Sequence, residues 1–331
     1  MRATSRSLAT LCGLAFLGLV VTEAAAEQHT PADWLQRMTS TMHHTNYAGV
    51  FVYRYGGNLE AMRIIHRSDD KGERERLVSL NGAAREIIRD NDQVTCILPD
   101  SHAVMVDRRQ ASNPLTDALP DDASALEPLY AMALSGRGRV AGRMAQRVTI
   151  RPRDAFRYGY RLWIGDKEGL LLRSDLVDGD GDPVEQVMFT DVHTPGTIPD
   201  DWLKPSMPGK EFTWYRPSKD KPSDDGDVSD SRWSVDGMPK GFKLVLYQRG
   251  GMPGLKSVVE HRLYSDGLAS VSLYIEQNAN THRSFQGHSR MGAVNAFGRV
   301  ISGHQVVVVG EVPAATVEAI GRGVRLEDAH Q

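Results

Sequence analysis

The chain contains, between Tyr47 and Arg67, the sequence YAGVFVYRYGGNLEAMRIIHR. Apolar side chains recur at every second position on both sides of the pair Gly56-Gly57, with Val50, Val52 and Arg54 on one parity and Phe51, Tyr53 and Tyr55 on the other. A two-residue period is typical of a β-strand, and two such runs joined by a short glycine turn predict an antiparallel hairpin. We therefore expect the fold to be organised around this hairpin.

The same alternation continues along the chain. Residues 74–80 and 83–89 flank Asn81-Gly82, and Asn-Gly is the strongest short signal for a hairpin turn. Further strands are predicted at residues 93–98, 138–151, 158–164, 170–177 and 184–192. Strands that follow one another through short turns pair in antiparallel fashion, so these segments predict one large antiparallel sheet.

Helices are predicted in two places within this half of the chain. Residues 31–42 begin with a proline and place Trp34, Leu35 and Met38 on one helical face. Between residues 101 and 135, leucines are spread among Asp, Ser and Pro, which predicts one or two short helices.

The N-terminus has the layout of a secretory signal peptide. Arg2 and Arg6 precede a continuous apolar run over residues 8–21, and small residues ending at Ala26 offer a cleavage site. The run of about 14 residues is short for a membrane span. We predict removal of residues 1–26 and export of the rest to the periplasm.

Export would leave one cysteine. Cys12 lies within the apolar run and would be removed with it, so Cys96 would remain alone. A single cysteine cannot close an internal disulfide or build a multi-thiolate metal site, and Cys96 in the apolar string VTCIL is expected to be a packing residue.

The composition changes after about residue 205. Residues 217–230 read PSKDKPSDDGDVSD and contain one apolar residue, Val228, which is typical of a linker. We predict a β-domain over 27–205, a linker over 206–232, a C-terminal domain over 233–325 and a tail over 326–331. The C-terminal domain is expected to be mixed α/β, with strands at 242–248, 258–264, 269–276 and 305–309 and a helix at 314–322. The expected class is mostly β with some α.

Charge and motifs exclude several classes of function. The net charge of −3, from 39 basic and 42 acidic residues, offers no basic field for nucleic acid. The sequence has no H-E-x-x-H zinc motif, and the serine in GHSRMG (287–292) lacks the glycine spacing of a hydrolase nucleophile turn. We therefore expect no enzymatic activity, no cofactor and no bound metal.

Arginines and apolar residues share the early strands. A group of guanidinium side chains beside an apolar trough would suit an anionic lipid. The head-group candidates are Arg63, Arg67, Arg74, Arg76 and Arg85, and the trough candidates are Val50, Val52, Ile65, Leu77, Ile87 and Trp163. Acidic residues alternate with these arginines, so an ordinary solvated sheet face is an open alternative.

Several strings, in order along both domains, carry a resemblance to one family. They include YAGVFVYRY (47–55), ERERLVSL (73–80), DKEGLLL (166–172), YSDGLASVSLYIE (264–276) and VVVGEVP (307–313). Together they resemble the periplasmic sigma-factor regulatory proteins RseB and MucB.

The resemblance implies a fold and a role. The large domain would be an unclosed antiparallel half-barrel like the lipoprotein carriers LolA and LolB. The family binds the periplasmic region of a transmembrane anti-sigma factor of the RseA/MucA type and shields it from site-1 proteolysis. It releases that segment on binding mislocalised lipopolysaccharide or other lipid, and so controls transcription in the envelope stress response. Within the C-terminal domain, Arg262, Tyr264 and Tyr274 are candidates for partner binding. A homodimer stays open as an assembly.

Two other functions stay open at this point. A periplasmic lipid or lipoprotein carrier would share the half-barrel but would not need residues 233–325. A secreted hydrolase would depend on a nucleophile such as Ser289 or Cys96.

Overall fold

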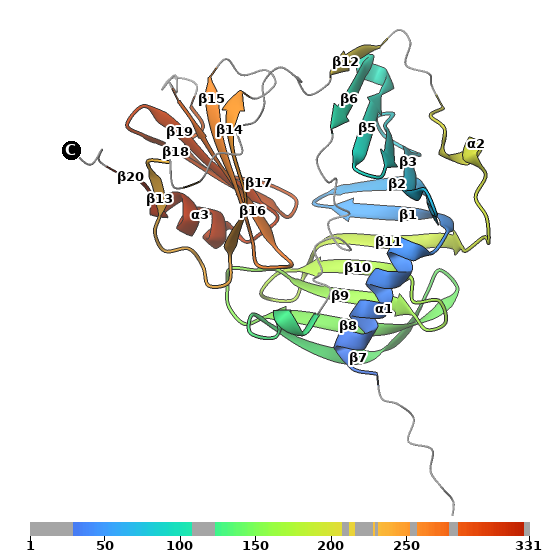
Figure 1. Ribbon diagram of the computed structural model, residues 1–331. Coiled ribbons are helices and arrows are strands. Elements are labelled where there is room, and N and C mark those ends of the chain that lie inside the picture. The colour runs from blue at the N-terminus through green and yellow to red at the C-terminus, as the bar shows by residue number, and fades with distance from the viewer. Residues whose placement is uncertain are drawn as a thin grey trace, which may run out of the picture.

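The computed structural model describes residues 29–107, 123–206, 212–215, 228, 231–251, 257–277 and 284–327. The predicted signal peptide and most of the predicted linker and tail lie outside these residues. The described chain forms a large antiparallel sheet with a helix against it and a second, smaller sheet with its own helix (Figure 1). This confirms the expected class, mostly β with some α.

The large sheet contains most of the strands predicted in the first half of the chain. Its spatial order is β12-β6-β5-β4-β3-β2-β1-β11-β10-β9-β8-β7. The strands are β1 (Tyr47–Tyr55), β2 (Asn58–Asp69), β3 (Gly72–Ser79), β4 (Glu86–Asp90), β5 (Gln93–Leu98), β6 (Ala103–Asp107), β7 (Tyr130–Val140), β8 (Arg143–Pro152), β9 (Gly159–Gly165), β10 (Leu171–Val177), β11 (Pro183–His193) and β12 (Thr213–Tyr215).

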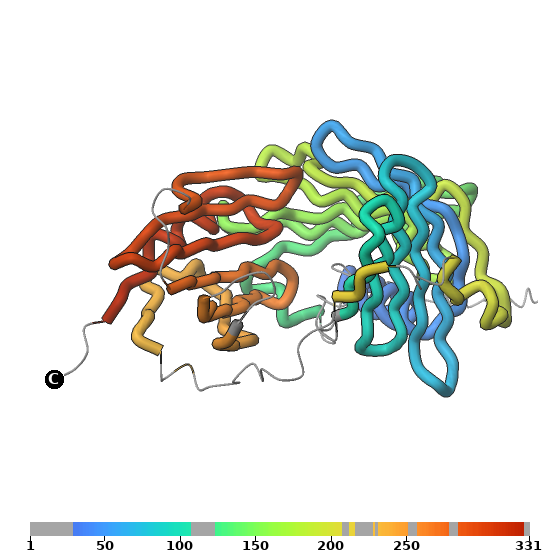
Figure 2. The backbone as a smooth tube through the Cα atoms, turned by 90° about the horizontal axis from the view of Figure 1, so that it is seen from above, coloured from blue at the N-terminus to red at the C-terminus, as the bar shows by residue number. Residues whose placement is uncertain are grey.

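The sheet is curved and open. Its outermost strands, β12 and β7, are not paired with each other, and the tube view shows the sheet wrapping around a hollow side (Figure 2). The described strands therefore form a half-barrel, as expected. Within the predicted linker, Thr213–Tyr215 pair in parallel with β6, a strand that the composition of that segment did not predict.

The segment around residue 140 differs from the prediction. A single strand was expected over 138–151, but β7 and β8 form a hairpin that turns at Ala141-Gly142, which have φ of 47° and 75°. Two positive φ values are typical of the turn that matches the twist of a hairpin. Residues 101–135 were predicted to hold one or two short helices, but the described part of this region contains the 3-10 turn η2 (Ala123–Leu126), the last residue of η1 (Pro99–Ser101), strand β6 and the first residues of β7. The helix prediction is therefore wrong for residues 103–107 and 130–135, which pair with neighbouring strands of the large sheet.

Helix α1 (Pro31–His44) occupies part of the hollow side of this sheet (Figure 1). It begins with a capping box, in which the Thr30 hydroxyl accepts from the Asp33 N–H and the Asp33 carboxylate accepts from the Thr30 N–H. Its buried face is the predicted one, extended by one turn to Met42. The Thr41 hydroxyl donates to the Glu168 carbonyl at 3.0 Å, so the helix is tied to the β9–β10 turn.

The second sheet has the order β14-β15-β16-β19-β18-β17. Its strands are β14 (Lys243–Gly251), β15 (Val258–Ser265), β16 (Ser270–Glu276), β17 (Gly287–Met291), β18 (Val294–Ile301) and β19 (His304–Gly310), and a separate pair joins β13 (Trp233–Val235) to β20 (Val324–Leu326). Helix α3 (Ala314–Gly323) packs on one face, with Val317 and Ile320 fully buried against strand valines. A helix against an antiparallel sheet agrees with the expected mixed α/β domain.

Within the described residues, none of the helices is long and apolar enough to cross a membrane.

The packing of α1 leads to the first prediction. Met38 is 0% exposed, whereas Met144 on β8 is 52% exposed. Replacing a fully buried methionine by alanine removes apolar contacts and leaves a cavity, so we expect Met38→Ala to lower the free energy of unfolding by about 2–5 kcal/mol. Met144→Ala is the matched control and should change it by less than about 1 kcal/mol. Urea denaturation measures both, and equal effects would contradict the burial of α1 against the sheet.

Candidate functional site

The hollow side of the large sheet contains a cavity of about 560 Å³. Apolar side chains from α1 and from strands on both sides of β1 form most of its wall: Met42, Phe51, Met62, Ile64, Leu77, Ile87, Val94, Leu172, Leu176, Val187 and Phe189. Helix α1 covers only part of the hollow side, and no described helix covers the part that holds the cavity. A concave, mostly apolar cavity with a few polar groups is the usual form of a small-molecule site.

The strand register decides which trough candidates reach this cavity. Leu77 and Ile87 are cross-strand partners and both line it. Successive side chains in a strand point to opposite faces, so Val50 and Val52 point away from the face that carries Phe51. Neither lines the cavity.

Ile65 and Trp163 also lie elsewhere. Ile65 packs on the outer face in a small cluster with Ile198 and Leu203, and the Trp163 ring stacks with the Arg173 guanidinium at 4.3 Å. None of the four trough candidates Val50, Val52, Ile65 and Trp163 therefore lines the cavity. For Val50 and Val52, the presence of Val, Phe and Tyr on both parities of β1 concealed which side chains face inward.

The five arginine candidates divide between the two faces in the same way. Arg85 lines the cavity, together with Arg89, which the sequence interpretation did not select. Arg85, Ile87 and Arg89 are spaced two residues apart and so point to the same face. Knowledge of the strand register across the Asn81-Gly82 turn would therefore have identified Arg89 as a cavity residue. Arg63 pairs with Val50 and Arg76 pairs with Ile65, so both lie on the outer face. Arg67 and Arg74 are cross-strand partners of each other and share the parity of Ile65 and Arg76, so they lie on the same face.

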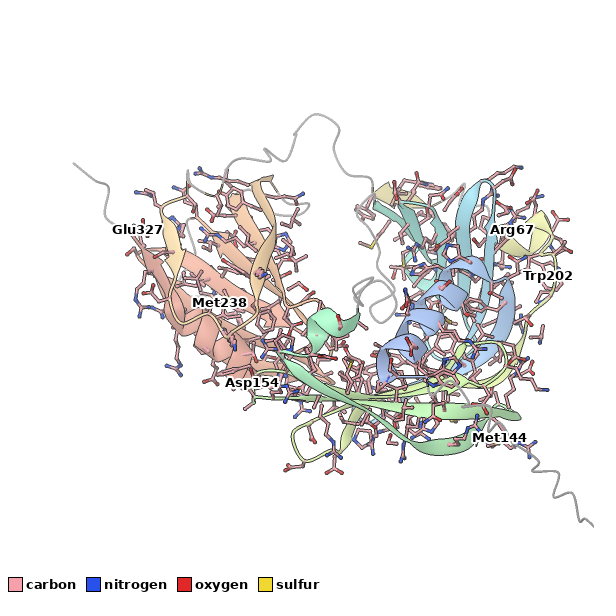
Figure 3. All side chains as sticks on the ribbon, turned by 60° about the horizontal axis from the view of Figure 1, so that its bottom comes forward. Arg67, Met144, Asp154, Trp202, Met238 and Glu327 are labelled. Carbon is pink, nitrogen blue, oxygen red and sulfur yellow. The ribbon has the colours of Figure 1, made fainter. Side chains whose placement is uncertain are left out.

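Two of the outer arginines hold the segment that follows β11 against the sheet. Arg67 is 8% exposed and donates to the Ile198 carbonyl at 3.1 Å and to Asp200 at 2.6 Å. Figure 3 shows Arg67 near α2 (Asp200–Leu203), which carries Trp202. Arg76 donates to the Trp202 carbonyl at 3.0 Å.

The buried carboxylate of Glu86 completes this attachment. It accepts from Arg76 at 2.5 Å and from the backbone and hydroxyl of Ser206 at 3.1 Å and 2.6 Å. Arg74 lies near Asp90 and Asp200, at 3.5 Å and 4.0 Å. Arg67 and Arg76 therefore attach the segment after β11 to the sheet. Arg63 lies on the same face and is exposed.

The end of the cavity nearest the second sheet is polar. Tyr53 donates to Glu185 at 2.7 Å, and Glu311, which follows β19, also lines the wall. Burial and the Glu185 carboxylate raise the pKa of the Tyr53 hydroxyl, so it stays a donor. Sequence analysis did not select these residues, because Glu311 reaches the cavity from the other domain and no periodic signal links it to β1.

The three partner-binding candidates in the second sheet do not gather on one surface. Arg262 is 4% exposed and donates to Glu260 and to the Trp233 carbonyl, at 2.8 Å and 2.7 Å. Tyr264 is buried in the core of this sheet. Tyr274 is half-buried on the opposite face, where its ring stacks on His261 at 4.4 Å. Arg262 and Tyr264 lie on the face of the sheet that packs against α3. There Arg262 holds β13 through the Trp233 carbonyl, and Tyr264 is part of the apolar core.

The two sheets meet at a buried arginine. Arg157, on the loop between β8 and β9, is fully buried and pairs with Asp154 and with Asp266 from the turn after β15. Tyr130 donates to the same Asp266 carboxylate at 2.9 Å. Figure 3 shows Asp154 where the large sheet approaches the second domain. We refer to the contacts between the two sheets as the domain boundary.

Comparison with known proteins identifies relatives along most of the chain. Residues 30–207 match the MucB/RseB N-terminal domain, and residues 227–325 match the MucB/RseB C-terminal domain. A sigma-E factor regulatory protein RseB from Haemophilus influenzae is 30% identical over 310 residues, covering 91% of this chain and 93% of its own. A sigma factor AlgU regulatory protein MucB from Pseudomonas aeruginosa is 31% identical over 334 residues, covering 96% and 98%.

Solved structures agree with these sequence matches. A crystal structure of MucB in complex with MucA(peri) superposes with a TM-score of 0.68 at 28% identity, covering 90% of this chain and 100% of that one. The complex of Pseudomonas aeruginosa MucA and MucB gives a TM-score of 0.69 at 29% identity, covering 90% and 99%.

The outer-face contacts lead to the second prediction. Arg67→Ala removes two hydrogen bonds to the segment containing Ile198 and Asp200, and we expect a loss of about 1–3 kcal/mol in unfolding free energy. Amide exchange in residues 194–206 should rise first, because the segment loses an attachment to the sheet. Arg63→Ala, on the same strand and face, is the matched control and should leave exchange unchanged. Hydrogen–deuterium exchange with mass spectrometry distinguishes the two variants.

Proposed function

The chain belongs to the MucB/RseB family, and we propose that it regulates a sigma factor by binding the periplasmic region of an RseA/MucA-type anti-sigma factor. The support comes from relatives named as regulators of sigma-E or AlgU and from the two complexes of MucB with MucA. The predicted signal peptide places this action in the periplasm. Transcription in the envelope stress response is the process that it would control.

The proposal includes protection of the anti-sigma segment from site-1 proteolysis. A bound extended segment is withheld from a protease active site for as long as the complex lasts. Tyr274 remains a candidate contact because part of its side chain is exposed to solvent. Arg262 and Tyr264 would act on the partner only by positioning β13 and the core around it.

The apolar cavity supports the second half of the proposal, in which mislocalised lipopolysaccharide or another lipid releases the partner. Acyl chains suit the wall formed by residues such as Phe51, Ile64 and Leu77, at roughly 25 cal/mol for each Å² of apolar surface removed from water. Arg85 and Arg89 lie in the same wall and could pair with phosphate or carboxylate head groups. This cavity is the observation on which the lipid half rests.

Release requires that the lipid bind two conformations with different affinity. The cavity wall contains Glu311 from the second sheet as well as residues of the large sheet. A ligand that fills the cavity would therefore act on the domain boundary, and a change in the boundary would alter a partner surface shared by both domains.

A periplasmic lipid or lipoprotein carrier is the alternative, since the same cavity would serve it. A carrier would not need the second domain for lipid binding, whereas a regulator would lose the anti-sigma segment without it. Deleting residues 233–331 and measuring lipid and peptide binding separately discriminates the two functions.

The third prediction tests which face of the sheet binds lipid. We expect saturating lipopolysaccharide to weaken binding of a synthetic MucA-type periplasmic peptide by tenfold or more in titration calorimetry. Leu77→Glu places a charge in the apolar wall and should abolish this effect of lipid. Val52→Glu places the same charge on the outer face of β1, two strands away from β3, and should retain it.

Two outcomes would contradict the proposal. If the peptide does not bind the unaltered protein, the regulatory function is wrong. If the peptide binds but lipopolysaccharide leaves its affinity unchanged, or Val52→Glu abolishes the effect while Leu77→Glu retains it, the cavity is not the lipid site. Circular dichroism of both variants checks that each remains folded.

A further inference from the structure

Two glutamates from different domains meet at the polar end of the cavity. Glu185 lies on β11 of the large sheet, and Glu311 follows β19 of the second sheet. Both side chains line the same end of the cavity, and the Glu185 carboxylate is among the causes that raise the pKa of Glu311. Two adjacent carboxylates repel, so a proton on one member of the pair is favoured.

The hydrogen-bond donors show which member takes the proton. Glu185 accepts from the Tyr53 hydroxyl at 2.7 Å and from the Ala293 N–H at 3.1 Å. Donors directed at both of its oxygens favour the ionised form of Glu185. Glu311 is then the protonated member of the pair.

The boundary is built to bring these groups close together. Gly292, in the turn between β17 and β18, has a φ of 61°, and a Cβ atom there would lie 3.2 Å from Glu185 Oε1. The neighbouring Ala293 is fully buried and belongs to the same apolar core as residues of the large sheet. Glu185 therefore ties the β17–β18 turn of one domain directly to β11 of the other.

The other ionisable groups around the pair come from several elements. Tyr53 and Tyr55 on β1 and Tyr160 on β9 interact electrostatically with Glu185, and Tyr53 and Tyr160 also with Glu311. The pKa of each tyrosine hydroxyl is raised above its ordinary value of 10, so all three are neutral below pH 9. Three more ionisable side chains line the same cavity: Glu75 on β3, Arg85 just before β4 and Arg89 on β4. The principal influences on Glu311 are its burial and the Glu185 carboxylate, and both disfavour its ionised form.

We propose that Glu185 and Glu311 form a protonation switch that holds the two domains together while they share a proton and separates them when it is lost. Ionisation of Glu311 would place two negative charges in contact inside an apolar boundary. Separation of the domains would return both carboxylates to water. The switch acts on the domain boundary itself, and it requires neither the anti-sigma partner nor lipid.

The direction of the pH dependence follows from the shift of Glu311. Burial and the neighbouring carboxylate raise the pKa of Glu311 from 4.5 to about 8. The joined arrangement therefore binds more protons than the separated one at pH values between the two. Its stability relative to the separated arrangement falls as pH rises from about 5 to about 8, and one proton contributes at most about a tenfold change per pH unit.

The fourth prediction measures the distance between the domains. Met144 on the large sheet and Glu327 beside β20 are exposed and lie in different domains (Figure 3). We would replace both by cysteine, replace Cys96 by serine, remove the predicted signal peptide and attach nitroxide labels. Double electron–electron resonance should show a longer-distance population that grows from pH 5.5 to pH 8.5.

Glu311→Gln keeps the side-chain volume and a hydrogen-bond donor but cannot ionise, so its distance distribution should be independent of pH. Glu318→Gln, on the surface of α3, removes the same charge away from the boundary and should retain the pH dependence. A pH-independent distribution in the unaltered chain, or the same pH dependence in Glu311→Gln, would overturn the proposal. Circular dichroism excludes unfolding as the cause of a change. The measurement contains no peptide or lipid, so its failure would be distinguishable from failure of the regulatory function.

Discussion

A wide antiparallel sheet has two faces, and each must be covered or filled if its apolar residues are to leave water. In this protein the inner face receives α1 and leaves an apolar cavity beside it. The outer face receives the segment after β11, which Arg67 and Arg76 attach through its carbonyl groups and Asp200. This division of the two faces determines which side chains can meet a ligand, and the remainder of the site follows from it.

Sequence patterns predicted the class, most strands and the helix at α1, because two-residue alternation, Asn-Gly and a proline start are local signals. They did not assign the faces. Val, Phe and Tyr occur on both parities of β1, so parity alone could not separate Phe51 from Val52. Leu77, Ile87 and Arg85, proposed from the sequence as trough and head-group residues, line the cavity. Arg67 and Arg76 were grouped with Arg85 on charge, although they donate to carbonyl groups about 130 residues away in the chain.

The domain boundary was beyond prediction for a related reason. Arg157 is surrounded by Asp154, Asp266 and the Phe242 ring, whose centroid lies 5.0 Å from the guanidinium carbon. Asp266 and Phe242 belong to a sheet whose packing on the first has no periodic signature in the sequence. A buried guanidinium with paired carboxylates and an aromatic neighbour specifies one docking geometry, because removal of any partner leaves a charge in an apolar environment. In the proposed switch at Glu185 and Glu311, a proton rather than an arginine would compensate the negative charge at the boundary.

The parallel pairing of β12 with β6 has a consequence for the range of domain motion. Because Thr213–Tyr215 are attached to the large sheet, the tether to the second domain begins only at residue 216 and ends at Trp233. A chain segment of that length spans at most about 60 Å when fully extended. A separated domain would thus remain at an effective concentration of the order of millimolar around its docking surface, and rejoining would be an intramolecular step whose rate does not depend on the amount of protein in the cell.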